Sequence, residues 1–137
     1  MEFFREIWEM LVREAPFMLR LLVACVCGCA IGVERSLRNK EAGIRTHIVV
    51  AIGAALAMVL SKYAFFDSAD ADASRIASQI ITGISFLGAG VIFVRGATIR
   101  GLTTAAGIWT TAVIGMAIGT GMYPLGIFTT VLMVVLQ

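Results

Sequence analysis

The stretch GVERSLRNKEAGIRTH, residues 32–47, places six charged side chains between two apolar segments. The whole chain is 59% hydrophobic and 15% charged, which is too apolar for a soluble domain of 137 residues. A helix needs about 20 mostly apolar residues to cross a bilayer, and the segments flanking residues 32–47 approach this length. We therefore predict an all-α membrane protein in which this stretch is a water-facing connector between two spanning helices.

The same reading along the chain predicts a polytopic bundle of about five transmembrane helices preceded by a short interfacial helix. Residues 1–15 have apolar side chains at helical spacing, with Trp8 expected at headgroup depth. Pro16 is expected to begin the transmembrane domain, residues 16–137. The third span is rich in glycine, so a bent or re-entrant segment is the alternative there. The expected spans are 17–34, 45–66, 75–94, 103–121 and 123–137.

Charge predicts the orientation of the bundle. Basic residues are concentrated in the connectors 34–47 and 95–100, whereas the opposite side has the acids Asp67, Asp70 and Asp72. Cytoplasmic connectors tend to be basic, so we expect both connectors and the C-terminus in the cytoplasm and the N-terminus outside.

Glycines at four-residue spacing predict close helix packing. Gly28 with Gly32 and Gly115 with Gly119 leave room for backbones to approach, and van der Waals contact is what associates helices in lipid. A compact bundle and a homo-oligomer, with a dimer favoured, follow from this reading. The alternative is that glycine is simply frequent in membrane helices.

Several function classes are disfavoured by the residues. The net charge of +2 comes from short water-facing stretches, so no nucleic-acid partner is expected. Cys25, Cys27 and Cys29 lie in one apolar segment without ligand spacing, so no metal site and no cofactor are expected. The only histidine, His47, is interpreted as a polar residue near a helix end, and no catalytic set is present, so the chain is not expected to be an enzyme.

Charges at the expected membrane boundaries are the remaining candidates. Glu34 ends the first span and Arg45 begins the second, so an ion pair between them would close the hairpin. Direct binding of a partner or an ion is the alternative role for these charges. On the opposite side, Asp72 or Ser74 is expected to cap the third helix.

Two segments together resemble the membrane domain of the MgtC/SapB family. They are GVERSLRNKEAGIRTH and RIASQIITGISFLGAGVIFVRGATIRGLTTAAGIW, and the resemblance covers residues 32–121. Two departures stand out, because residues 72–75 read Asp-Ala-Ser-Arg where the family commonly has a proline, and Ser85 replaces a frequent glycine. The matching motif positions are Glu34, Arg35, Gly43, Arg45, Thr46, Asp72, Arg75, Gln79, Gly83, Gly88, Gly90, Gly101, Leu102 and Thr104.

The resemblance implies a bacterial inner-membrane protein linked to growth under magnesium limitation and, in pathogens, to survival inside macrophages. It also implies a cytoplasmic C-terminal domain in many members, so we expect this chain to be the membrane portion. Three hypotheses follow. The first is a non-enzymatic membrane regulator that acts through protein partners such as ATP synthase. The second is a transporter or channel for Mg²⁺ or another small solute, and the third is a scaffold that acts only through a separate cytoplasmic domain.

Overall fold

The computed structural model describes residues 1–64 and 72–137. It contains the helices α1 (Glu2–Leu37), α2 (Ile44–Tyr63), α3 (Ala73–Gly90), α4 (Leu102–Gly119) and α5 (Tyr123–Leu136), with the short strands β1 (Phe93–Arg95) and β2 (Thr98–Arg100) between α3 and α4. The predicted all-α class is confirmed. The acids Asp67 and Asp70, used above for orientation, lie outside the described residues.

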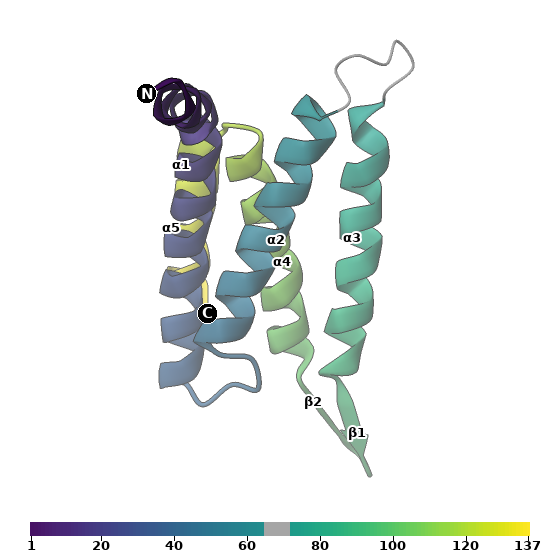
Figure 1. Ribbon diagram of the computed structural model, residues 1–137. Coiled ribbons are helices and arrows are strands. Elements are labelled where there is room, and N and C mark those ends of the chain that lie inside the picture. The colour runs from purple at the N-terminus through teal and green to yellow at the C-terminus, as the bar shows by residue number, and fades with distance from the viewer. Residues whose placement is uncertain (65–71) are drawn as a thin grey trace.

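The helices form a bundle with α2 and α4 in the middle, α1 and α5 on one side, and α3 on the other (Figure 1). The α1–α2 connector and the β1–β2 hairpin lie at the same end of the bundle, as the predicted topology requires. The chain also ends toward this side, whereas α3 begins at the opposite end. Residues from both predicted connectors therefore share one end of the molecule.

Glycines hold the central helices together by direct backbone contact. A Cβ added at Gly28 would lie 2.6 Å from the His47 carbonyl oxygen of α2. On α4, Gly115 and Gly119 face the carbonyl oxygens of Ala51 and Ala55 so closely that a Cβ would overlap them. Such contact is available only where the helix surface has no side chain, which confirms the predicted role of the four-residue glycine spacing.

The first 37 residues contain one helix where the sequence predicted two. Helix α1 runs for 36 residues, with Pro16 inside it rather than at the start of a new helix. Figure 1 shows the N-terminal turns nearly end-on and the remainder running along the bundle, so the helix is bent. A proline inside a helix removes one backbone hydrogen bond, which permits such a bend without a break. The interfacial position of residues 1–15 stays a prediction.

The third predicted span ends earlier than expected. Helix α3 covers Ala73–Gly90 without interruption, so it is not broken at its glycines, and residues 93–95 belong to β1 instead. The re-entrant alternative stays a prediction. The turn into α4 depends on Gly101, which has a φ of +86°, and a Cβ there would overlap the Val91 carbonyl oxygen. Only glycine adopts this conformation at so close a backbone approach. The hairpin is therefore held against the end of α3.

Three of the described helices, α1, α2 and α4, are long and apolar enough to cross a membrane, and α5 is a shorter apolar helix. Helix α3 has 18 residues but includes Arg75, Gln79 and several hydroxyl side chains, which dilute its apolar surface. The architecture is that of a membrane helical bundle.

Candidate functional site

The predicted motif residues lie in three places. The largest group lies at the end of the bundle formed by the α1–α2 connector and the hairpin. Asp72 and Arg75 lie at the opposite end, and the remaining motif residues lie along α3. We call the first group, together with the connector residues 38–43 and the hairpin residues 93–100, the connector–hairpin face. Its predicted members are Glu34, Arg35, Gly43, Arg45, Thr46, Gly101, Leu102 and Thr104.

Glu34 is held by two arginines, Arg35 of its own helix and Arg38, which directly follows that helix. One carboxylate oxygen lies 2.5 Å from Nε of Arg35 and the other lies 2.5 Å from Nε of Arg38. The Arg35 side chain is 1% exposed, so its charge requires a nearby counter-charge. The predicted Glu34–Arg45 pair is therefore wrong, because Arg45 is exposed and both oxygens of Glu34 are already paired.

Glu41 links the connector to α4. The hydroxyl of Thr104, which is fully buried, donates a 2.6 Å hydrogen bond to Oε2 of Glu41. This bond joins residues 63 positions apart and brings the two halves of the motif into contact. The Thr104 hydroxyl is the main cause of a lowered pKa of Glu41, and the positive charges of Lys40 and Arg100 add to it. Glu41 is therefore held ionised.

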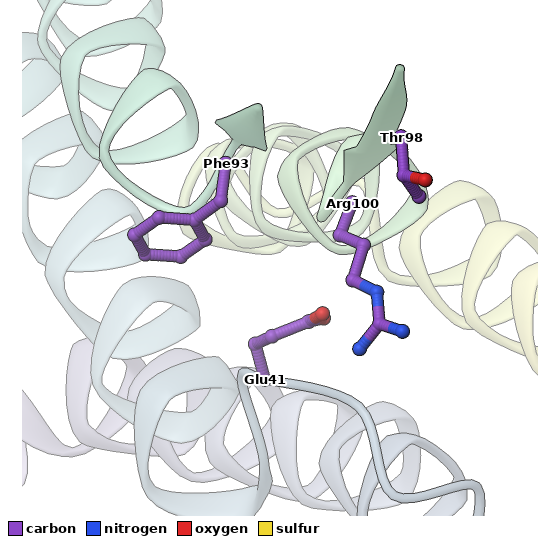
Figure 2. Close-up of a pocket in the computed structure, with 4 residues that line it drawn as sticks. All are labelled: Glu41, Phe93, Thr98 and Arg100. Carbon is purple, nitrogen blue, oxygen red and sulfur yellow. The ribbon is translucent and has the colours of Figure 1, made fainter. Parts of the chain in front are cut away.

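A cavity of about 410 Å³ opens beside this bond and is lined by Glu41, Phe93, Thr98 and Arg100. The carboxylate of Glu41 and the guanidinium of Arg100 point into the same space from opposite walls, with the ring of Phe93 beside them (Figure 2). Among the described residues, the structure records no ion pair between these two charges. The cavity therefore presents one anion and one cation that attract each other through space without forming a direct ion pair.

Sequence reasoning did not single out Glu41 or Arg100. Six charged residues occupy the opening stretch, and nothing in their spacing distinguishes Glu41 from the others. The one available signal was the Thr104 position at the start of a buried helix, where a hydroxyl needs an acceptor. That signal indicates that Thr104 has a hydrogen-bond acceptor but does not identify the residue.

His47 lies near the start of α2, as the sequence predicted. It is 0% exposed in the first turns of α2, where its carbonyl oxygen contacts Gly28 and its Nε2 lies 3.7 Å from the position that a Cβ on Gly107 would occupy. The interpretation as a polar residue near a helix end is confirmed, and the structure adds that His47 packs in the core against Gly28 and Gly107. Neither ring nitrogen has a hydrogen-bond partner among the described residues.

At the opposite end of the bundle, Asp72 caps α3. Its Oδ1 accepts a 2.8 Å hydrogen bond from the backbone N–H of Ser74, which confirms the predicted cap. Hydrogen bonds from Ser74 lower the pKa of Asp72, and the charge of Arg75 adds to this effect. Asp72 and Glu34 lie at opposite ends of the bundle, so they do not form a common site.

Helix α3 offers a largely open surface. Gln79 and Gly83 line a groove of about 330 Å³ between α3 and α2, opposite Gly53, and no heavy atom lies within 4 Å of a Cβ placed at Gly83 or Gly90. Gly88 differs, since it is buried in ordinary contact with Ala105 of α4. The predicted glycines of α3 are therefore divided between a packed face and an exposed one.

Most hydroxyls within the helices bond to their own backbone. Thr82, Ser85, Thr111 and Thr130 each donate to the carbonyl oxygen four residues earlier, at distances of 2.8–3.0 Å. Such bonds satisfy the hydroxyl inside an apolar environment. No group of three or more His, Cys, Asp or Glu side chains that could hold a metal ion occurs within residues 1–64 and 72–137.

The fold and this site define a polytopic helical membrane protein with a charged face at one end of its bundle. A sequence profile of the MgtC family matches residues 21–137, and the chain belongs to that family. The predicted family resemblance is thereby confirmed.

Three relatives show the extent of the similarity. The chain is 52% identical over 123 residues to the "Putative magnesium transporter YhiD" of Escherichia coli K12, covering 86% of this chain and 57% of the relative. It is 44% identical over 117 residues to "Protein MgtC" of Salmonella typhimurium, covering 85% and 49% respectively. An uncharacterised Synechocystis protein is 45% identical over 106 residues, covering 77% and 44%. The chain thus spans about half the length of these relatives, and no solved structure matches it.

Proposed function

We propose that this chain is the membrane part of a non-enzymatic regulator in the bacterial inner membrane, linked to growth under magnesium limitation and acting through a protein partner. The link to magnesium rests on the relatives, one of which is named "Putative magnesium transporter YhiD". The N-terminus would lie outside and the connector–hairpin face in the cytoplasm, in line with its basic residues. The partner would be a second copy of the chain or another membrane protein such as ATP synthase.

The observation that carries the proposal is the Glu41–Thr104 hydrogen bond. It joins the two motif halves into one face whose outer residues, including Lys40, Arg45 and Thr98, are exposed. Within the bundle, by contrast, the crossings at Gly28 and Gly115 are closed by backbone contact. Exposed residues of the connector and the hairpin at one end of the bundle, over a closely packed interior, favour docking over passage of a solute.

Transport of Mg²⁺ or another small solute is the second candidate function. It is favoured by the name of the YhiD relative and by the groove between α2 and α3, in which Gln79 and Gly83 lie. Mg²⁺ prefers several oxygen ligands in octahedral order, and Gln79 would provide one of them. A site completed by another copy or by a further domain would be needed.

Flux and crosslinking separate the two candidates. The purified chain is reconstituted into liposomes containing a Mg²⁺-sensitive dye, and we expect uptake equal to that of protein-free liposomes. Uptake that Gln79→Leu abolishes and the control Thr129→Val on α5 leaves intact would replace the regulator proposal with the transporter.

A photoreactive residue at position 45, an exposed position on the connector–hairpin face, is then tested in native membranes against one at position 128 on the exposed surface of α5. The regulator proposal expects one reproducible protein adduct from position 45 and none from position 128. Equal crosslinking from both positions, or adducts with lipid alone, would contradict it.

A further inference from the structure

The cavity between the connector and the hairpin has the chemistry of a site for a zwitterion. Its walls present the carboxylate of Glu41 and the guanidinium of Arg100, which point into the same space without an ion pair between them (Figure 2). Its volume of about 410 Å³ falls within the range of small-molecule sites. A ligand with a negative and a positive group close together would satisfy both charges at once.

The two charged groups are available to a ligand in different ways. Thr104 occupies Oε2 of Glu41, which fixes the carboxylate, and the carboxylate makes no ion pair recorded among the described residues. The lowered pKa of Glu41 keeps the carboxylate charged at neutral pH. The exposed side chain of Arg100 has no hydrogen bond or ion pair recorded within the described chain, and a guanidinium binds phosphate oxygens in bidentate fashion.

The surroundings of the cavity indicate where the ligand comes from. The hairpin extends from the end of the bundle (Figure 1), and it exposes Phe93 by 59%, Val94 by 71% and Ile99 by 55%. Apolar side chains of this size are costly in water but favourable at the membrane interface, where aromatic rings lie at the headgroup level. The cavity would then open at the depth of the lipid headgroups.

We propose that this cavity binds the headgroup of a phosphoethanolamine lipid, with its phosphate at Arg100 and its ammonium at Glu41. Phe93 lies beside the charges, where it contacts the apolar carbons of the lipid. Because Glu41 also accepts the hydrogen bond from Thr104, a lipid bound to Glu41 would help to hold the connector against α4. This inference goes beyond the proposed function and does not depend on it.

Native mass spectrometry tests the proposal on the purified chain in mild detergent. Phosphatidylethanolamine and phosphatidylglycerol with identical acyl chains are added in equal amounts, and the retained lipid is counted. We expect phosphatidylethanolamine to be retained preferentially. Arg100→Gln should lower its retention about tenfold, the loss expected for one charge-assisted hydrogen bond.

Glu41→Gln keeps an acceptor for Thr104 but removes the charge, so it should abolish the preference between the two lipids. Arg45→Gln is the matched control, since it removes an exposed cation from the same end of the bundle without altering the cavity lining. Circular dichroism and gel filtration establish that each variant is folded before lipid is added. Equal retention of the two lipids by the unaltered chain, or unchanged retention in Arg100→Gln, would overturn the proposal.

Free phosphoethanolamine separates the lipid from a soluble ligand of the same chemistry. It is added as a competitor at increasing concentration, both with and without lipid. Retention of the lipid at concentrations where free phosphoethanolamine alone leaves no adduct supports the lipid as the source. Adducts of free phosphoethanolamine, without any preference for phosphatidylethanolamine, would overturn the lipid assignment.

Discussion

Replacing Gly28 by alanine tests whether direct backbone contact holds α1 against α2. A Cβ at this position would lie 2.6 Å from the His47 carbonyl oxygen and 3.0 Å from Cβ of Ala51. Ordinary van der Waals contact begins at 3.4 Å, so the helices must separate locally by about 0.8 Å to restore it. The contacting oxygen belongs to helical backbone and has no rotamer through which to move away. Over-packing of this kind costs about 1–3 kcal/mol of stability.

Gly53→Ala is the matched control, because a Cβ at Gly53 of α2 has no heavy atom within 4 Å. Both variants gain about 1 kcal/mol of helix propensity, so the difference between them isolates the cost of packing. The assay is reversible unfolding of the purified chain in mixed micelles with increasing sodium dodecyl sulfate. We expect Gly28→Ala to be less stable than Gly53→Ala by about 1–3 kcal/mol. Equal free energies of unfolding for the two variants would refute the reasoning.

Three further predictions concern the charged groups. Thr104→Val removes the donor to Glu41, so the pKa of Glu41 should rise toward its ordinary value, as measured by carboxyl NMR titration. Because the pKa of Glu41 is lower in the folded state than in the unfolded state, the stability from this bond is complete above the unfolded-state pKa. It is lost as the pH falls through the folded-state pKa. The unfolding curves of Thr104→Val and of the unaltered chain should therefore converge in acid. A double-mutant cycle between Glu34→Ala and Arg45→Ala should give no coupling energy, and a clear coupling would restore the pair that the structure rejects. Asp72→Ala should lower the melting temperature while Asp72→Asn keeps it, and an equal loss in both variants would show that charge rather than capping matters.

The helical framework could be predicted because it follows from local features of the chain. Apolar segments of spanning length predicted the helices, and glycine spacing predicted which faces of α1 and α4 pack closely, although not that α2 is the partner of both. The predictions that failed are those for which a local sequence rule permits two structures. Pro16 both starts helices and bends them, and the observed helix uses the second option. Residues 91–94 are apolar enough to continue α3, but the helix ends at Gly90, and Phe93 and Val94 belong to the hairpin instead.

The candidate site was only partly predictable, because its key contact joins distant residues. The family motifs identified Thr104 and the connector, but no pattern within either segment pairs Thr104 with Glu41 across 63 positions. The same holds for Arg100, which enters the cavity only because the hairpin turns it toward the connector. Charge spacing along a sequence indicates which residues face water, whereas the pairing of charges depends on the packing of the helices.

The failed Glu34–Arg45 pair shows how burial decides between possible partners. Arg35 lies in the last turn of α1 with 1% of its side chain exposed, so leaving its guanidinium without a counter-charge would be the costliest outcome at this end of the bundle. Glu34 is adjacent to it, and Arg38, the residue that follows the end of α1, pairs with the second carboxylate oxygen. An exposed Arg45 keeps its hydration and gains little from an ion pair. Glu34 therefore stabilises the C-terminal end of α1 through Arg35 and Arg38. Glu41, in the connector that follows, is the acid that links this end of the bundle to α4.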